Sequence, residues 1–67
     1  MRRFEYVDEK SNKYWEIEVQ NTEVLTRYGR IDTTGQETIK SFASNTEADL
    51  AAMKLITSKL KKGYQEV

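Results

Sequence analysis

Three consecutive residues, Tyr28, Gly29 and Arg30, place an aromatic ring and a guanidinium group in one short stretch of chain. They lie near the end of an alternating segment, residues 24–31, of the kind that forms a β-strand. Because strand side chains alternate sides, the ring and the guanidinium share one face, and the glycine leaves room for a close neighbour. A ring beside a planar cation can stack on a sugar or base and hold a phosphate. The pattern suits a contact surface as well as ordinary strand packing.

A second pair of candidates, Asn12 and Lys13, ends a polar turn and begins another alternating segment. Lys13 supplies a point charge, and Asn12 can form hydrogen bonds to phosphate oxygens. Gln36 follows the turn glycine Gly35, and its amide can bond to backbone or to a partner. These residues are candidates for the same contact surface.

Each candidate also has a purely structural interpretation. Aromatic and arginine side chains commonly cover a sheet surface, asparagine is a good turn residue, and lysine solubilises strand edges. A further basic patch could form from Lys59, Lys61 and Lys62 together with Arg2 and Arg3. The negative end of a helix dipole already favours the three lysines, so we expect them to cover a solvated face.

Four segments have the alternation expected of strands, and turn residues separate them. In the clearest segment, Trp15, Ile17 and Val19 share one side, and we assign them to the core. We expect the other side to be in water: Tyr14, Glu16, Glu18 and Gln20. The predicted strands are residues 3–7, 13–20, 24–31 and 36–42.

After residue 42 the apolar period changes from two to about 3.6 residues, which predicts a helix. Ser44 and Glu47 are spaced as a capping box at its start, and Gly63 suits its C-terminal end. An apolar stripe should pack this helix on the sheet, with Leu55 and Ile56 in the core. The stripe is Ala48, Ala51, Ala52, Leu55, Ile56 and Leu60. We therefore predict an α+β domain in which one C-terminal amphipathic helix covers a small four-stranded antiparallel sheet.

Composition restricts the functions open to these 67 residues. Eleven basic and eleven acidic side chains give no net charge, whereas a protein that coats DNA without sequence preference is usually basic. Any nucleic-acid contact must therefore come from local clustering of charge.

The chain has neither cysteine nor histidine, which excludes disulfides, thiolate or imidazole metal ligands and histidine catalysis. No nucleophile stands beside a base, and no glycine loop resembles a phosphate cradle. We therefore expect no enzyme activity, no cofactor and no metal. The lack of cysteine fits a cytoplasmic location, and no long apolar run marks export or a membrane span.

Three ordered blocks of the sequence resemble the WGR domain. Tyr28-Gly29-Arg30-Ile31 followed by Gly35-Gln36 resembles the block that names the family. Upstream, residues 11–19 resemble its Asn-Lys-aromatic-aromatic pattern and the strand after it. Downstream, Ser41-Phe42, Glu47-Ala48 and residues 61–64 also fit. The resemblance covers nearly the whole chain.

WGR domains occur in DNA-dependent poly(ADP-ribose) polymerases and in bacterial MolR-type proteins labelled as molybdate-metabolism regulators. The resemblance implies that residues 1–67 are one domain of a longer bacterial regulator-like protein. It also implies a non-catalytic module that recognises a DNA backbone or end without sequence specificity. The implied contact residues are Asn12, Lys13, Tyr28, Gly29, Arg30 and Gln36.

Two residues depart from the family pattern. Tyr28 stands where the family usually has tryptophan, and Asp32 stands where it usually has glycine. Tyrosine can still stack, but a carboxylate at Asp32 would compete with phosphate for Arg30. Asp32 and the zero net charge favour an alternative function, a protein–protein or interdomain module without nucleic-acid affinity.

Overall fold

The computed structural model describes all 67 residues, and its elements follow the alternation in the sequence. Four strands come first: β1 (Arg2–Val7), β2 (Asn12–Gln20), β3 (Glu23–Arg30) and β4 (Gln36–Ser41). The helix α1 (Asn45–Lys61) and a short strand β5 (Gln65–Glu66) complete the chain. The predicted α+β class, the antiparallel sheet and the single helix are confirmed, but the sheet has five strands rather than four.

The additional strand, β5, is too short for sequence alternation to predict. Gly63, with φ of +104°, turns the chain after α1. β5 then pairs antiparallel with β1, so that Phe4 lies opposite Glu66 and Glu5 opposite Gln65. The Val67 N–H donates to the carbonyl of Arg3 over 3.0 Å, which fastens the end of the chain to the sheet.

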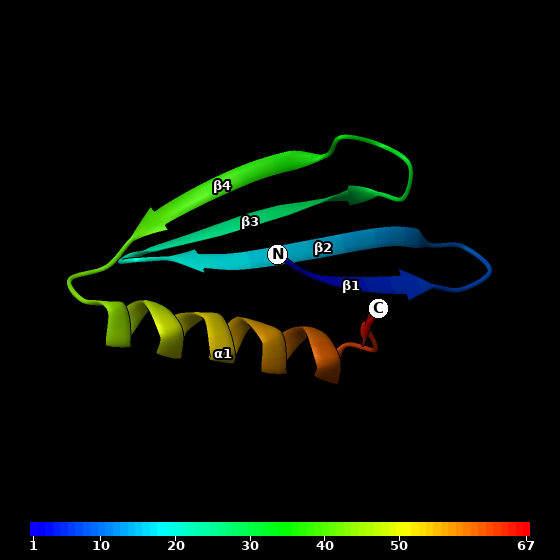
Figure 1. The fold of residues 1–67 in the computed structure, drawn as a ribbon. Helices are drawn as coiled ribbons and strands as arrows, with labels where there is room; N and C mark the ends of the chain where they lie inside the picture. The colour runs from blue at the N-terminus through cyan, green and yellow to red at the C-terminus, as the bar shows by residue number, and fades with distance from the viewer.

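The sheet has the strand order β4-β3-β2-β1-β5, and α1 runs along one of its faces, roughly in the direction of the strands (Figure 1). The helix packs against β2 and β3, while β4 lies away from it at the opposite edge. We call the covered side, which carries Trp15, Ile17 and Val24, the helix-side face. The other side, which carries Tyr14 and Glu16, is the open face.

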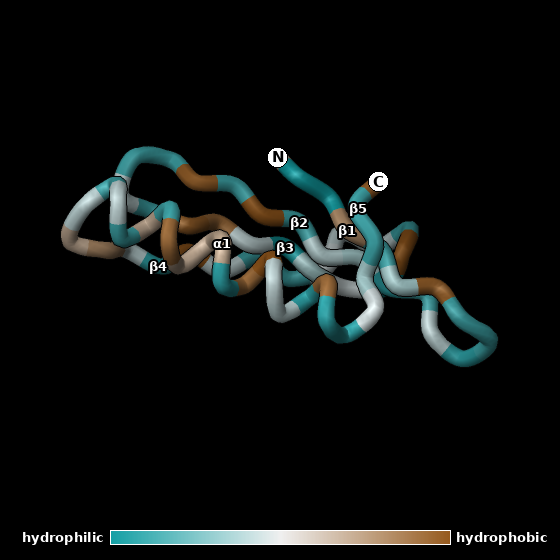
Figure 2. Tube along the Cα trace, turned by 90° about the horizontal axis from the view of Figure 1, so that it is seen from below, coloured by the Kyte–Doolittle hydropathy of each residue, from teal (hydrophilic) through white to brown (hydrophobic).

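A small hydrophobic core lies between α1 and the helix-side face. Six buried residues form it, and Val19, Phe42, Ile56 and Tyr64 pack around its margin. Figure 2, seen from the helix side, shows hydrophobic residues recurring at intervals along the chain rather than in one run. No helix in the structure has the length and apolar character to cross a membrane. The six buried residues are Phe4, Trp15, Ile17, Val24, Ala48 and Ala52.

The helix contacts the sheet along a narrower line than the sequence predicted. Ala48 and Ala52 are buried and Ile56 is half-buried, so the contact line advances by four residues at a time. Leu55, which we assigned to the core, is 42% exposed because it lies beside this line. Leu60 is also exposed, because the last turn directs Lys59 rather than Leu60 toward Trp15.

Tyr14 on the open face is buried, although we expected it in water. The guanidinium of Arg3 lies 4.4 Å from the centroid of its ring. On its other side, the Tyr14 hydroxyl donates a 3.0 Å hydrogen bond to the carbonyl of Thr33 in the β3–β4 loop. The loop folds over this part of the sheet, so the open face has a covered end beside Arg30.

Candidate nucleic-acid interface

Tyr28 and Arg30 lie two residues apart on the helix-side face, at the end of β3. Tyr28 is opposite Trp15 on one side and Gln36 on the other. Its ring is 41% exposed, and its hydroxyl donates a 3.0 Å hydrogen bond to the side-chain oxygen of Gln36. Gln36 therefore holds the ring in place from the neighbouring strand.

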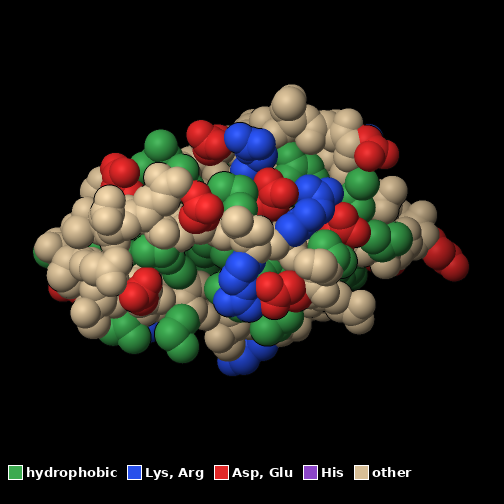
Figure 3. All heavy atoms as spheres, in the orientation of Figure 1, with side chains coloured by type: hydrophobic (Ala, Val, Ile, Leu, Met, Phe, Trp, Pro, Cys, Tyr) green, Lys and Arg blue, Asp and Glu red, His purple; other side chains and the backbone are tan.

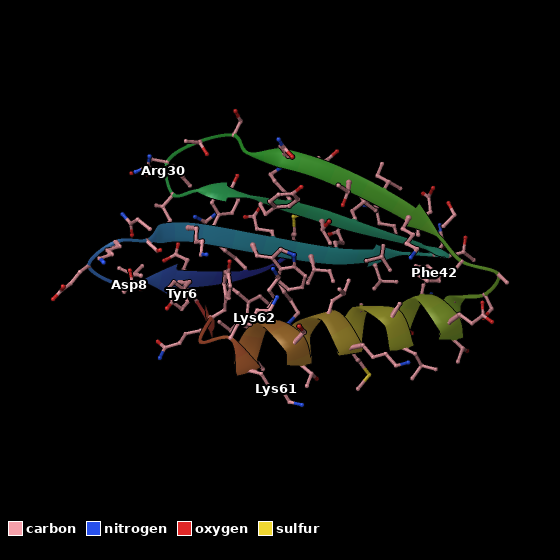
Figure 4. All side chains as sticks on the ribbon, turned by 180° about the vertical axis from the view of Figure 1, so that it is seen from behind. Tyr6, Asp8, Arg30, Phe42, Lys61 and Lys62 are labelled. Carbon is pink, nitrogen blue, oxygen red and sulfur yellow. The ribbon has the colours of Figure 1, made fainter.

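Arg30 is exposed and forms no ion pair within the chain. Figure 4 shows it projecting from the end of β3, away from the body of the sheet. Asp32, the carboxylate expected to compete for this guanidinium, does not pair with it either. The guanidinium therefore remains available to an anion from outside the chain.

Three further cations also form no ion pair within the chain, namely Lys13, Lys59 and Lys62. Lys13 is directly opposite Arg30 in the β2–β3 ladder, an arrangement that costs free energy because like charges repel. Its ammonium lies 5.3 Å from the ring centroid of Tyr6, and that of Lys59 lies 5.5 Å from the ring centroid of Trp15. We call Lys13, Arg30, Lys59 and Lys62 the cationic cluster.

The cluster is electrostatically strained at Lys59. Partial burial lowers the pKa of this ammonium below its usual value, and the charges of Lys62 and Lys13 lower it further. Aromatic faces stabilise Lys13 and Lys59 in part, because the ring of Tyr64 also lies within 6.0 Å of both. A bound anion would relieve the remaining repulsion.

Asn12 and Gly29 do not share the surface formed by Lys13, Tyr28, Arg30 and Gln36. Strand alternation places both on the open face. The carbonyl of Asn12 accepts a 2.9 Å hydrogen bond from the N–H of Ile31, which helps to close the end of the sheet.

Gly29 makes room for the protein's own β3–β4 loop. A Cβ at this position would lie 2.9 Å from the Cα of Gly35 and 3.2 Å from the hydroxyl of Thr33. The close neighbour that the sequence implied is therefore the loop itself. In the Tyr28-Gly29-Arg30 motif, Tyr28 and Arg30 face the helix side, and Gly29 leaves room for the β3–β4 loop on the open face.

The β3–β4 loop has a fixed conformation that depends on special residues. Gly35 has a φ of +68°, and a Cβ there would overlap the Tyr28 carbonyl and the Tyr14 hydroxyl. Asp32 has a φ of +72°, in the left-handed region that aspartate tolerates better than most residues. This backbone explains why glycine suits position 32 in the family pattern. The Thr33 hydroxyl donates to the Arg30 carbonyl over 2.6 Å and ties the loop to the site.

Charges are distributed unequally between the two faces of the sheet. Arginines on the open face are paired: Arg3 with Glu5 and Glu16, and Arg27 with Glu37. Figure 3 shows acidic and basic side chains next to each other across the middle of one side of the molecule. On the helix-side face the strands carry Arg2, Lys13, Arg30 and Lys40, and Glu66 is the only acid among them.

We expected Lys59 and Lys62 at a solvated helix end, but Lys59 lies close enough to both Lys62 and Lys13 for their charges to lower its pKa. One signal could have found Lys59. It lies three residues after Ile56, so it continues the line of Ala48, Ala52 and Ile56 that faces the sheet. A lysine on a buried line, directed at an aromatic ring, is a candidate for binding an anion.

Known proteins resemble this chain over its whole length. The family model of the WGR domain matches residues 1–67. Protein YehF of Escherichia coli strain K12 is 47% identical over 66 residues, which cover 98% of this chain and 24% of that protein. The uncharacterized protein YfeS of the same organism is 42% identical over 65 residues, covering 97% of this chain and 27% of that protein.

The fold also matches a solved structure. A crystal structure of a Bacteroides fragilis protein superposes with a TM-score of 0.97 at 48% sequence identity, covering 98% of this chain and 19% of that chain. The chain thus spans about a quarter of the length of the curated relatives and less of the crystallised one. On the whole-length family match and these identities, the chain belongs to the WGR domain family.

Proposed function

We propose that this WGR domain is a non-catalytic module that binds DNA through its backbone and ends. The observation that carries the proposal is the pairing of an exposed, anchored ring at Tyr28 with an unpaired guanidinium at Arg30. A ring that can stack and a cation that can bind phosphate are thus presented together on one face, with further cations nearby that form no ion pair within the chain. Family membership supports the same assignment.

Each side chain has a distinct role in this proposal. Tyr28 stacks on a terminal sugar or base, and Gln36 fixes the orientation of its ring. Arg30 and Lys13 hold phosphate oxygens, the first through a planar fork and the second as a point charge. α1 lies on the sheet and offers no recognition helix for a major groove, so binding depends on backbone and end geometry rather than on sequence.

The setting of the module is also part of the proposal. The WGR resemblance to MolR-type proteins favours a bacterial regulator-like protein, and the lack of cysteine favours the cytoplasm. No role in molybdate chemistry follows from the residues of this chain.

Fluorescence polarisation with nicked, blunt and single-stranded DNA tests the proposal. Arg30→Ala should weaken binding at least tenfold, because a hydrogen bond to a charged group is worth about 1.5–3 kcal/mol. Tyr28→Ala should also weaken binding. Arg27→Ala is the matched control, since Arg27 is on the same strand but faces the open side and pairs with Glu37. Unchanged affinity in both Arg30→Ala and Tyr28→Ala, with folded circular-dichroism spectra, would refute the assignment.

Salt dependence separates this function from a second candidate. If three or four cations of the cluster neutralise phosphates, affinity should fall by roughly 100-fold between 50 and 200 mM salt. The second candidate, docking to a protein or a neighbouring domain, is favoured by the exposed apolar side chains of Leu50 and Met53 on α1. Binding that depends on Leu50 and Met53, with little dependence on salt, would support it.

A further inference from the structure

A groove of about 320 Å³ lies between α1 and the β3–β4 side of the sheet. It forms because β4 extends beyond the area that the helix covers (Figure 1). Tyr28 lines one end of the groove and Phe42 the other, where β4 joins α1. Figure 4 shows Phe42 and Arg30 at opposite ends of the sheet. The groove therefore runs along the sheet toward the Tyr28 surface, and its volume lies in the range of small-molecule sites.

The chemistry of the groove is aromatic and cationic. Its charged side chains are two lysines, and no acidic residue lines it. The ammonium of Lys40 lies 5.6 Å from the ring centroid of Phe42, and that of Lys59 lies 5.5 Å from that of Trp15. Neither lysine forms an ion pair within the chain. Two cations without counterions, one on the helix and one on the sheet, favour an anionic occupant.

The groove is continuous with the proposed DNA surface. Tyr28 belongs to both, since it lines the groove and its ring is exposed beside Arg30. Lys59 also belongs to both the groove and the cationic cluster. A DNA backbone held by Arg30 and Lys13 can therefore continue into the groove and remain close to lysine side chains. This continuity favours a nucleic acid over an acidic peptide as the occupant.

We propose that the groove binds an unpaired nucleotide of a single-stranded DNA extension. The base stacks on the groove side of Tyr28, and the adjoining phosphates lie between Lys40 and Lys59. This inference rests on the proposed function and adds a preference among DNA ends. The module should bind a duplex with a single-stranded extension more tightly than the same duplex with a blunt end.

The test compares one duplex, blunt or with a short thymidine extension, by fluorescence polarisation. The extension should tighten binding about tenfold, because stacking of one base on an aromatic side chain is worth about 1–3 kcal/mol. Thr38→Tyr on β4 places a large ring in the groove and should abolish this gain while leaving blunt-end affinity unchanged. Ile39→Tyr, the next residue but on the open face, should keep the gain.

A charge variant tests the phosphate contact that we assign to Lys40. Lys40→Gln should reduce the gain from the extension, whereas Lys54→Gln on α1, outside the groove, should not. Circular dichroism and thermal unfolding confirm that each variant is folded before its affinity is compared.

Equal affinity of the native domain for blunt and extended duplexes would overturn the inference and leave the proposed function standing. Retention of the gain in Thr38→Tyr would overturn it in the same way. Loss of binding to every DNA probe at low salt would instead refute the proposed function and the inference together. A labelled peptide of leucine and glutamate residues could instead bind the native domain and not Thr38→Tyr. That result, with no gain from a DNA extension, would identify a protein-binding site and overturn the inference.

Discussion

The two faces of this sheet use charge in opposite ways. On the open face, Arg3 and Arg27 are each held by glutamates of neighbouring strands. On the helix-side face, Lys13, Lys59 and Arg30 have aromatic or like-charged neighbours and form no ion pair, although the charge of Asp8 acts on Lys13 from a longer distance. A net charge of zero therefore conceals one neutralised face and one cationic face. Net charge does not exclude an anionic ligand when strand alternation can separate the signs.

Two tyrosines show the same division between stability and contact. Tyr14 on the open face is buried under Arg3 and the β3–β4 loop, and its hydroxyl is used within the fold. Tyr28 on the helix-side face keeps 41% of its surface in solvent while Gln36 anchors its hydroxyl. The polar groups of the open face are therefore mostly paired within the fold, whereas several on the helix-side face are not. Removing a paired charge, such as that of Arg3, should destabilise the domain, and removing an unpaired one, such as that of Lys59, should stabilise it.

The largest expected effect is at the loop that covers the open face. Gly35→Ala should destabilise the domain by about 2–4 kcal/mol, because the new Cβ meets the Tyr28 carbonyl and the Tyr14 hydroxyl at a positive φ. A domain this small has little stability to lose, so much of the protein should be unfolded. Urea denaturation measures the effect, and Thr34→Ala in the same loop is the control. A Gly35→Ala midpoint equal to that of Thr34→Ala would contradict the loop geometry.

Arg3→Ala tests the neutralised face. It should cost about 1 kcal/mol, mainly because the Tyr14 ring loses its cover, since exposed ion pairs add little on their own. Arg27→Ala is the matched control, because Arg27 also pairs with a glutamate on the open face but its guanidinium lies over no aromatic ring. A shift in the urea midpoint as large for Arg27→Ala as for Arg3→Ala would show that cover of Tyr14 is unimportant.

Lys59→Met tests the cationic face and should have effects of opposite sign on stability and binding. The folded state lowers the pKa of this lysine, so it carries a cost of charging at neutral pH that disappears only as pH rises toward its usual value of 10.5. Removing the charge should stabilise the domain by about 0.5 kcal/mol. The same variant should bind DNA several-fold more weakly and show a smaller salt slope. Destabilisation of Lys59→Met would mean that the ammonium is well satisfied in the fold.

The smallest expected effect is on how the stability of the domain falls at acidic pH. Hydrogen bonding to Arg2 lowers the pKa of Glu66, and backbone N–H groups of Lys10 and Ser11 lower that of Asp8. Because both pKa values are lowered on folding, the stabilisation is present above the usual values of 4.5 and 3.8 and is lost as pH falls below them. Glu66→Gln should flatten the decline in urea midpoint through this range. Glu9→Gln, in the β1–β2 turn, should follow the native curve.

The main elements could be predicted from the sequence because each depends on local signals. Alternation located four strands, and the change of period with Ser44 before it located the helix, whose Glu47 N–H donates to the Ser44 hydroxyl over 3.1 Å. β5 was missed because its two residues are defined only by pairing with β1. Burial of Tyr14 was missed because the loop that covers it comes from 19 residues further along the chain.

The candidate site could be predicted only in part. Strand periodicity correctly placed Tyr28 and Arg30 on one face, and the register adds Lys13 and Gln36 from neighbouring strands. Helical spacing after Ile56 could place Lys59 toward the sheet, but its contact with the Trp15 ring depends on how the last turn of α1 packs. The absence of a carboxylate partner for Arg30 is a tertiary fact that no spacing could give, since Asp32 is only two residues away.

The position of β5 also has a mechanical consequence. Both chain ends leave the sheet at the same end of the β1–β5 ladder, where Val67 bonds to Arg3. A force that separates the two ends would load these few hydrogen bonds one after another rather than all at once. In a longer polypeptide under tension, β5 should peel away first and carry Tyr64 from Lys13 and Lys59, while the remaining strands stay zipped.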